Sequence, residues 1–265
     1  MMKLAEAEDM SRGFIKFLGT AGARVVMSKQ LRSSGGIWIC LGKCHLLLDP
    51  GPGTLIRCWE GSPPLDPTLL DGIILSHRHL DHSGDMNVMV EAMADGGFHP
   101  KGQVFAPADV IEGPEPVLFQ YLRSYTKKIN VLRAGAAFDL KDIRIEVPVR
   151  HLHPVETYGV KLFYQDISIS CITDTRFFPG LIDAYQADIV MINMTFLKPF
   201  HSEKAFHLSA EEILPLISCL KPKAVLLTHF GKRVIEAGPE MIAGQLAKET
   251  GVSVIAAKDG MMFNF

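Results

Sequence analysis

Three histidines and one aspartate lie close together in this chain, at His77, His79, Asp81 and His82. Imidazole nitrogens and carboxylate oxygens are ligands that zinc and similar divalent ions take in proteins. Side chains two residues apart in an extended segment point to the same side, so His77 and His79 can share one ion. Asp81 and His82 can then turn toward a second ion. The spacing therefore indicates a site for two metal ions.

Predicted secondary structure places this segment at a strand-to-helix junction. Residues 72–76 form a short apolar run typical of a buried strand, and residues 85–94 carry apolar side chains at helical spacing. A polar surface loop that is merely rich in histidine is the alternative interpretation. The flanking strand and helix count against it, because they fix the loop at the end of a buried element.

The rest of the chain has the pattern of a mixed α/β protein with strands in both halves. Two glycine-rich loops, 19–22 and 49–53, follow predicted strands and allow close backbone approach. The middle, 96–133, is less regular. Ser209 and Glu212 fit a capping box that starts a helix. Strands are expected at 14–18, 37–41, 45–49, 143–149, 159–164, 167–171, 187–194, 224–228 and 252–256, and further helices at 116–127, 178–185, 209–220 and 239–250.

The pattern His77-x-His79-x-Asp81-His82 resembles the signature of the metallo-β-lactamase superfamily of hydrolases. The resemblance implies an α/β fold, the αββα sandwich, in which two mixed sheets are flanked by helices. It implies a single domain over residues 1–265, with 1–12 as a flexible N-terminal segment. Two divalent ions are expected, zinc first, although manganese and iron accept the same ligands. Such a pair of ions lowers the pKa of a bridging water, which makes hydroxide available near neutral pH.

The superfamily needs three further ligands, each at the end of a strand. The resemblance assigns them to His153, to Asp174 as the carboxylate that bridges both ions, and to His229. His151 is the alternative for the third histidine. His153 is preferred because its distance from the string Thr157-Tyr158-Gly159 matches the phosphodiesterase branch. Each residue alone is more typical of a cap, a turn or an ordinary histidine, so the argument depends on their order.

The segment His207-Leu208-Ser209 is similar to a motif of the phosphoribosyl cyclic phosphodiesterases and of ribonuclease Z. In those families the histidine protonates or stabilises the leaving oxygen. His207 precedes the predicted helix start at Ser209, a place that favours anions. An exposed loop histidine is the alternative. Asp81, which is also a predicted ligand, and His207 are the candidate catalytic residues.

These resemblances predict a dinuclear phosphodiesterase that acts on a small anionic phosphoester, a cyclic phosphate or a nucleotide-like compound, through the bridging hydroxide. A ribonuclease Z-like endonuclease acting at tRNA 3′ ends is the first alternative. A non-catalytic metal-binding or sensor protein is another, but no expected ligand is missing. A thioester or lactam hydrolase of the same superfamily leaves His207 without a role.

Two departures from the related branches bear on the substrate. Ribonuclease Z usually carries a long arm that grips tRNA, whereas residues 159–171 predict a tight hairpin around Gln165-Asp166. The cysteine-bearing zinc loop that many cyclic phosphodiesterases add is not recognisable in this sequence. A nucleic-acid substrate is therefore less favoured than a small one.

The charge balance also argues against a dedicated nucleic-acid binder. Lys and Arg total 27 against 29 Asp and Glu, so the net charge is -2 and there is no overall basic field. The apolar runs are far shorter than the ~20 residues that span a bilayer. We expect a soluble enzyme without a membrane segment, and a homodimer is compatible with the sequence.

The N-terminus and the cysteines favour the cytoplasm. Residues 1–12 lack the basic and then apolar layout of a signal peptide. The five cysteines are odd in number, which fits reduced thiols. Cys40, Cys44 and His45 form a local cluster, but it lies in a strand-like run and is expected to pack rather than to bind zinc.

Overall fold

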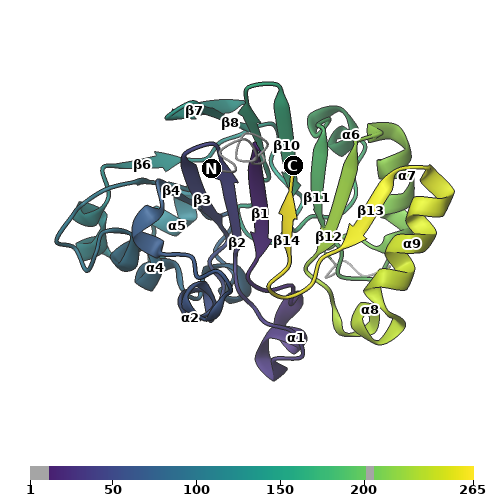
Figure 1. The fold of residues 1–265 in the computed structure, drawn as a ribbon, viewed down its shortest axis with the longest axis horizontal. Helices are drawn as coiled ribbons and strands as arrows, with labels where there is room; N and C mark the ends of the chain where they lie inside the picture. Colours follow the sequence, from purple (N-terminus) through teal and green to yellow (C-terminus); the bar gives the residue numbers. More distant parts are fainter. Residues whose placement is uncertain (1–11, 201–205) are drawn as a thin grey trace, which may run out of the picture.

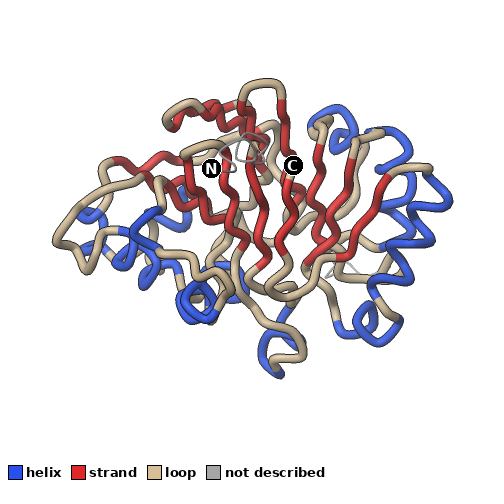
Figure 2. Tube along the Cα trace, viewed as in Figure 1, coloured by secondary structure: helices blue, strands red, loops and turns tan. Residues whose placement is uncertain are grey.

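Two sheets face each other and helices flank them, as Figures 1 and 2 show. The computed structural model describes residues 12–200 and 206–265. The predicted αββα class is confirmed, with two mixed seven-stranded sheets. The predicted flexible segment, 1–12, lies outside the described residues except for Arg12, whose guanidinium pairs with Asp166 at 2.7 Å.

The first sheet has an antiparallel and a parallel half. In sheet order its strands are β14 (Met262–Asn264), β1 (Gly13–Phe17), β2 (Ile37–Leu41), β3 (Cys44–Leu48), β4 (Gly72–Ile74), β5 (Gln103–Ala106) and β6 (Lys128–Val131). β14, β1, β2 and β3 pair antiparallel, whereas β3 to β6 run parallel. β3 and β4 are in register at Leu48 and Ile74, so the residues after both strands emerge side by side.

The second sheet repeats this division. Its order is β13 (Ser253–Ala256), β12 (Ala224–Thr228), β11 (Ile189–Asn193), β10 (Ile167–Ile172), β9 (Val160–Tyr164), β8 (Ile143–Val147) and β7 (Ala136–Leu140). β10 to β13 run parallel, and β7 to β10 pair antiparallel. The carboxyl ends of β10, β11 and β12 therefore meet at one edge of the sheet.

Apolar side chains from both sheets fill the space between them. Phe17 and Ile39 of the first sheet belong to the same buried cluster as Leu162, Ile169 and Met191 of the second. Alternation along the strands explains this, because every second side chain points inward. A separate buried cluster lies under the helices on the outer face of each sheet.

The helices are short except near the C-terminus. They are α1 (Ala23–Lys29), α2 (Thr54–Glu60), α3 (Leu80–Ser83), α4 (Met86–Met93), α5 (Ala108–Ile111), α6 (Gly180–Ala184), α7 (Ala210–Leu220), α8 (Lys232–Ala237) and α9 (Pro239–Thr250). The predicted capping box starts α7, because Ser209 and Glu212 exchange hydrogen bonds. Among the helices that the structure describes, none has the length and apolar character to cross a bilayer.

The middle of the chain, which was expected to be less regular, holds two strands that were not predicted. Residues 96–133 contain β5 and β6, and the predicted helix 116–127 is only a 3₁₀ helix, η2 (Gln120–Tyr125). Both strands are four residues long and pair parallel, with β6 at the edge of the sheet, so no local turn signal marks them. A second 3₁₀ turn, η1 (Pro67–Leu69), precedes β4. α1, α2, β7 and β14 were not expected either.

Candidate metal centre

The predicted ligands lie at the carboxyl ends of strands from both sheets. His77 lies three residues after the end of β4, Asp174 lies two residues after β10, and His229 directly follows β12. His79 is the residue that precedes α3, so Asp81 and His82 sit in the first turn of that helix. Parallel strands place their carboxyl ends together, which is why residues far apart in sequence meet here. All seven predicted ligands are brought together by the structure.

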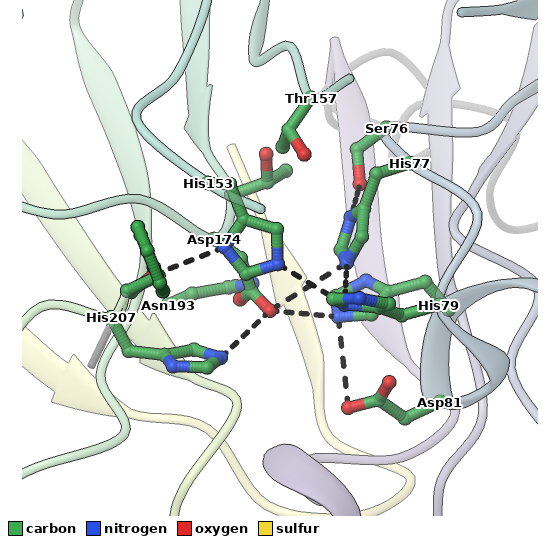
Figure 3. A network of polar contacts seen from close by, with 12 residues as sticks. Ser76, His77, His79, Asp81, His153, Thr157, Asp174, Asn193 and His207 are labelled. Atoms are coloured by element: carbon green, nitrogen blue, oxygen red, sulfur yellow. Dashed lines mark hydrogen bonds and ion pairs between the residues drawn. The ribbon is translucent and has the colours of Figure 1, made fainter. Parts of the chain in front are cut away.

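His77, His79 and His153 form one group of facing imidazoles (Figure 3). Nδ1 of His79 lies 3.1 Å from Nε2 of His77 and 3.1 Å from Nε2 of His153. Burial lowers the pKa of His153 to about 4 and that of His77 well below its ordinary value. Burial also lowers the pKa of His79. The neutral rings present the lone pairs that metal coordination requires.

Asp81, His82 and His229 form a second group. Nε2 of His82 lies 3.0 Å from Nε2 of His229, and Oδ2 of Asp81 lies 3.5 Å from the same His229 atom. These donors come from α3 and from the residue after β12, so both sheets contribute to the group. The three ligands can hold a second ion beside the first.

Asp174 lies between the two groups. Figure 3 shows its carboxylate in contact with His77 and His207. Its Oδ2 is 3.2 Å from Nε2 of His82 and 3.8 Å from Nε2 of His77, while Oδ1 is 3.4 Å from Nδ1 of His229. The side chain is 1% exposed. A carboxylate in this position reaches both ligand groups, which is the geometry expected of a bridge.

The donor set fits two cations. Burial would lower the pKa of His82, but the carboxylates of Asp174, Asp49 and Asp81 raise it well above its ordinary value. Positive charge is therefore stabilised at this point. The converging imidazole nitrogens need either protons or a cation between them. Together with the fold, the cluster points to divalent-metal binding.

His151, the alternative third ligand, lies outside the cluster. Its Nε2 is 2.7 Å from the Tyr185 hydroxyl and its Nδ1 is 3.3 Å from the Asp174 carbonyl oxygen. Burial lowers its pKa to about 4. Both nitrogens thus contact groups other than the proposed ligand atoms. His153 is the residue whose ring reaches His79.

Side chains and carbonyls behind the ligands fix their orientation. Nδ1 of His82 donates to Oδ2 of Asp49 at 2.8 Å. The Ser76 hydroxyl lies 2.9 Å from Nδ1 of His77 and donates to the same Asp49 oxygen at 2.7 Å. The Phe206 carbonyl oxygen lies 3.1 Å from Nδ1 of His153. Sequence reasoning missed Asp49 and Ser76, although each is the last residue of a predicted strand.

The His229 turn is held by close backbone packing. His229 has a positive φ of 59°, an uncommon conformation for a residue with a side chain. A Cβ at Gly22 would collide with the His229 carbonyl, and one at Gly231 would collide with the Thr195 carbonyl. The Thr195 hydroxyl lies 3.0 Å from Nδ1 of His229. Glycine at both positions therefore lets these loops fix the ring.

His207 faces Asp174, as Figure 3 shows. Its Nε2 lies 3.1 Å from Oδ2 of Asp174, and its side chain is 20% exposed. Burial opposes protonation of His207, but Asp174 raises its pKa. The predicted proximity of His207 to the ligands agrees with the structure. Its catalytic role stays a prediction.

A cavity of about 560 Å³ opens over the ligands. Its wall includes His207 and Pro154 on one side and Arg24 of α1 on another. Arg24 makes no hydrogen bond or ion pair with the described residues. Burial lowers the pKa of His79, and the positive charge of Arg24 lowers it further. Sequence reasoning missed this arginine, because nothing indicated that α1 lies beside the ligands. The cavity combines a metal-binding floor with a cationic rim.

The Cys40, Cys44 and His45 cluster lies away from this site, on β2 and β3. Both thiols are buried, and burial raises the pKa of Cys44 to about 12. Nδ1 of His45 accepts a hydrogen bond from the Trp38 indole at 3.0 Å. These contacts give the cluster a packing role.

A family model described as the beta-lactamase superfamily domain matches residues 45–230, the stretch that carries all seven predicted ligands. The chain belongs to the metallo-β-lactamase superfamily. An uncharacterized protein of Methanocaldococcus jannaschii is 28% identical over 256 residues, which cover 93% of each protein. The superfamily membership predicted from the His77 motif is thus confirmed.

Solved structures share the fold of this superfamily member over nearly its whole length. The metallo-beta-lactamase fold protein YhfI from Bacillus subtilis has a TM-score of 0.79 and 21% identity, covering 96% of this chain and 99% of its own. A diphosphatase from the PhnP family has a TM-score of 0.70 and 17% identity, with 96% and 98% covered. Human tRNase Z, short form, has a TM-score of 0.68 and 15% identity, with 95% and 98% covered.

Proposed function

We propose that the protein is a dinuclear, metal-dependent phosphodiesterase that hydrolyses a small phosphoester. The observation that carries the proposal is the position of Asp174 between two groups of three ligands, with His207 against the same carboxylate. Two adjacent ions suit a displacement at phosphorus, because they can stabilise charge on both the attacking and the leaving oxygen. The likeness to a diphosphatase from the PhnP family supports phosphoester chemistry.

The proposed ligands divide by group. His77, His79 and His153 hold one ion, while Asp81, His82 and His229 hold the other, with Asp174 shared. Zinc is the proposed metal, since five histidines suit it. The ions supply positive charge and lower the pKa of water to near neutrality when bound. The protein's own residues bind the ester and transfer the proton to the leaving oxygen.

The phosphoryl group would lie in the cavity above Asp174. Arg24 on the rim attracts an anionic ester through its positive charge. No described residue pairs with its guanidinium, so this charge is available to the ester. His207 faces the same space, and Nε2 is the atom that we assign to proton transfer to the leaving oxygen. A neutral lactam or thioester would not use the Arg24 charge.

A ribonuclease Z-like endonuclease is the second candidate, and the likeness to human tRNase Z favours it. The β9–β10 hairpin argues against it. Tyr164 and Ile167 pair directly across the Gln165-Asp166 turn, so no arm extends from this hairpin. The net charge of -2 gives no general attraction for an RNA backbone. A small diester therefore fits better than tRNA.

A panel of substrates tests the proposal. The metal-loaded protein would be assayed on bis(p-nitrophenyl) phosphate, on cyclic nucleotides, on a tRNA precursor and on a β-lactam. We expect turnover of the small diesters and little of the other two. Efficient lactam cleavage without diester hydrolysis would refute the phosphodiesterase assignment, and loss of all activity with both metals bound would favour the non-catalytic alternative.

A further inference from the structure

A second cavity, of about 690 Å³, lies next to the metal-centre cavity. Ala23 and Val25 of α1 line both cavities, so the two spaces adjoin at this helix. The volume is within the range of pockets that bind small organic ligands. The remaining wall comes mainly from two segments, residues 195–200 after β11 and residues 231–233 at the start of α8. A substrate long enough to pass α1 would therefore contact both cavities.

Phe196 connects the second cavity to His207. Its ring lies 5.7 Å from the His207 ring at 86°, an edge contact, and it also lines the second cavity. Backbone hydrogen bonds from Thr195 and Phe196 to the Leu208 carbonyl hold this arrangement. A leaving group at His207 would therefore lie near Phe196, which lines the second cavity.

The wall of the second cavity favours a planar and polar ring. Phe200 stacks on Phe196 at 5.9 Å and is still 62% exposed, so one face is free for a ligand. Lys198, Lys232 and Arg233 also line the cavity. Two of these cations are partly neutralised, because Lys198 pairs with Glu211 at 3.5 Å and Lys232 with Glu236 at 3.4 Å.

An aliphatic chain in this cavity would remove water from cationic groups without replacing their hydrogen bonds. A nucleobase stacks on phenylalanine and offers acceptor atoms to lysine and arginine. The mixture of aromatic and cationic residues thus fits a heterocycle better than a lipid.

We propose that the second cavity binds the leaving group of the substrate and that this group is a nucleoside. The base stacks against Phe200, and the ribose oxygen that leaves phosphorus lies at His207. The assignment rests on the proposed phosphodiesterase function and specifies its substrate as a nucleotide ester.

Ligand binding tests the assignment without turnover. Calorimetry on the metal-loaded protein would compare adenosine 5′-monophosphate with ribose 5-phosphate, which keeps the phosphate and sugar but lacks the base. We expect the nucleotide to bind at least about five-fold more tightly, as stacking of one base on an aromatic ring provides. Phe200→Ser should abolish most of this preference, and the exposed Phe200 can be replaced without disturbing the core.

Phe98→Ser is the matched control, because Phe98 is 84% exposed and lies outside both cavities. It should keep the preference for the nucleotide. Equal binding of the two phosphates, or a preference that survives Phe200→Ser, would overturn the assignment. Tighter binding of octyl phosphate than of the nucleotide would also overturn it, in favour of an aliphatic group. Hydrolysis of bis(p-nitrophenyl) phosphate in the same preparation separates these outcomes from failure of the proposed function.

Discussion

Asp49 and His82 are joined by a hydrogen bond of 2.8 Å from Nδ1 to Oδ2, which turns Nε2 of the ring toward His229 and Asp174. Asp49 comes from the first sheet, directly after β3, and also accepts hydrogen bonds from the backbone and hydroxyl of Ser76 at 2.7 Å each. All its contacts are with donors, so the carboxylate fixes both the His82 tautomer and the loop that begins at Ser76.

Asp49→Asn should therefore weaken metal binding without removing a ligand. The amide has the same shape, but its NH₂ group meets a donor wherever it is placed. Loss of such a partner lowers metal affinity roughly 10- to 100-fold. Competition with a chromogenic chelator measures the change. Asp188→Asn is the control, because Asp188 accepts from the Ser168 backbone and hydroxyl in the same way. An affinity loss that is equal in the two variants would mean a general effect on folding.

Metal stoichiometry tests the bridge. We expect about two transition-metal ions per chain after reloading, because each ligand group offers three donors and shares Asp174. Asp174→Ala should lower the occupancy of both positions, whereas Asp81→Ala should lower only one. Elemental analysis after desalting gives the counts. Full occupancy in Asp174→Ala, or a count well below one ion in the wild type, would contradict the dinuclear assignment.

Arg24 should contribute to substrate binding more than to turnover. Arg24→Ala removes a charge-assisted contact to the ester, so KM for a small diester should rise roughly 10-fold. The value of kcat should change little, since the contact is the same in the ground and transition states. Steady-state kinetics separates the two parameters. Arg57→Ala, on the exposed side of α2, should leave both at their wild-type values. A drop in kcat with an unchanged KM would assign Arg24 to the transition state.

The ligands could be predicted from the sequence because they end strands that have clear patterns. The His77 to His82 segment has diagnostic spacing in one short loop. Asp174 lies two residues after β10, and His229 directly follows the largely apolar strand β12. The Ser209 capping box is local chemistry, and it was predicted at the right residue. Each of these signals depends on neighbours in the sequence.

The features that were missed depend on contacts between distant residues. Asp49 begins a glycine-rich loop that was recognised, but its hydrogen bonds to Ser76 and His82 appear only when β3 lies beside β4. Arg24 reaches the cavity because Gly22 lets α1 pack against the His229 carbonyl. β5 and β6 pair parallel across long connections, so their partners are not encoded by a turn. The sequence shows which chemical groups these residues have, but it does not show which of them lie close together in the fold.

Precursor tRNA should be a poor substrate. The β9–β10 hairpin has no arm, and the chain lacks a net positive charge. We expect its kcat/KM to be far below that of the best small diester in the same buffer and with the same metal. Precursor cleavage would be followed on gels at low ionic strength, because this condition is the most favourable for tRNA binding. Cleavage at the 3′ end at a rate that matches the small diester would favour the endonuclease.

His207 should transfer a proton to the leaving oxygen. In His207→Ala the seven ligands remain, so metal content and melting temperature should stay near those of the wild type. Turnover of an alkyl diester should fall roughly 10²- to 10⁴-fold, the usual range for a general acid. A p-nitrophenyl ester should lose much less, because p-nitrophenolate leaves without a proton. His99→Ala, an exposed histidine paired with Asp95, is the control and should leave both rates unchanged. Equal losses on the two esters would mean that His207 positions Asp174 instead of transferring the proton, since a positioning role does not depend on the leaving group.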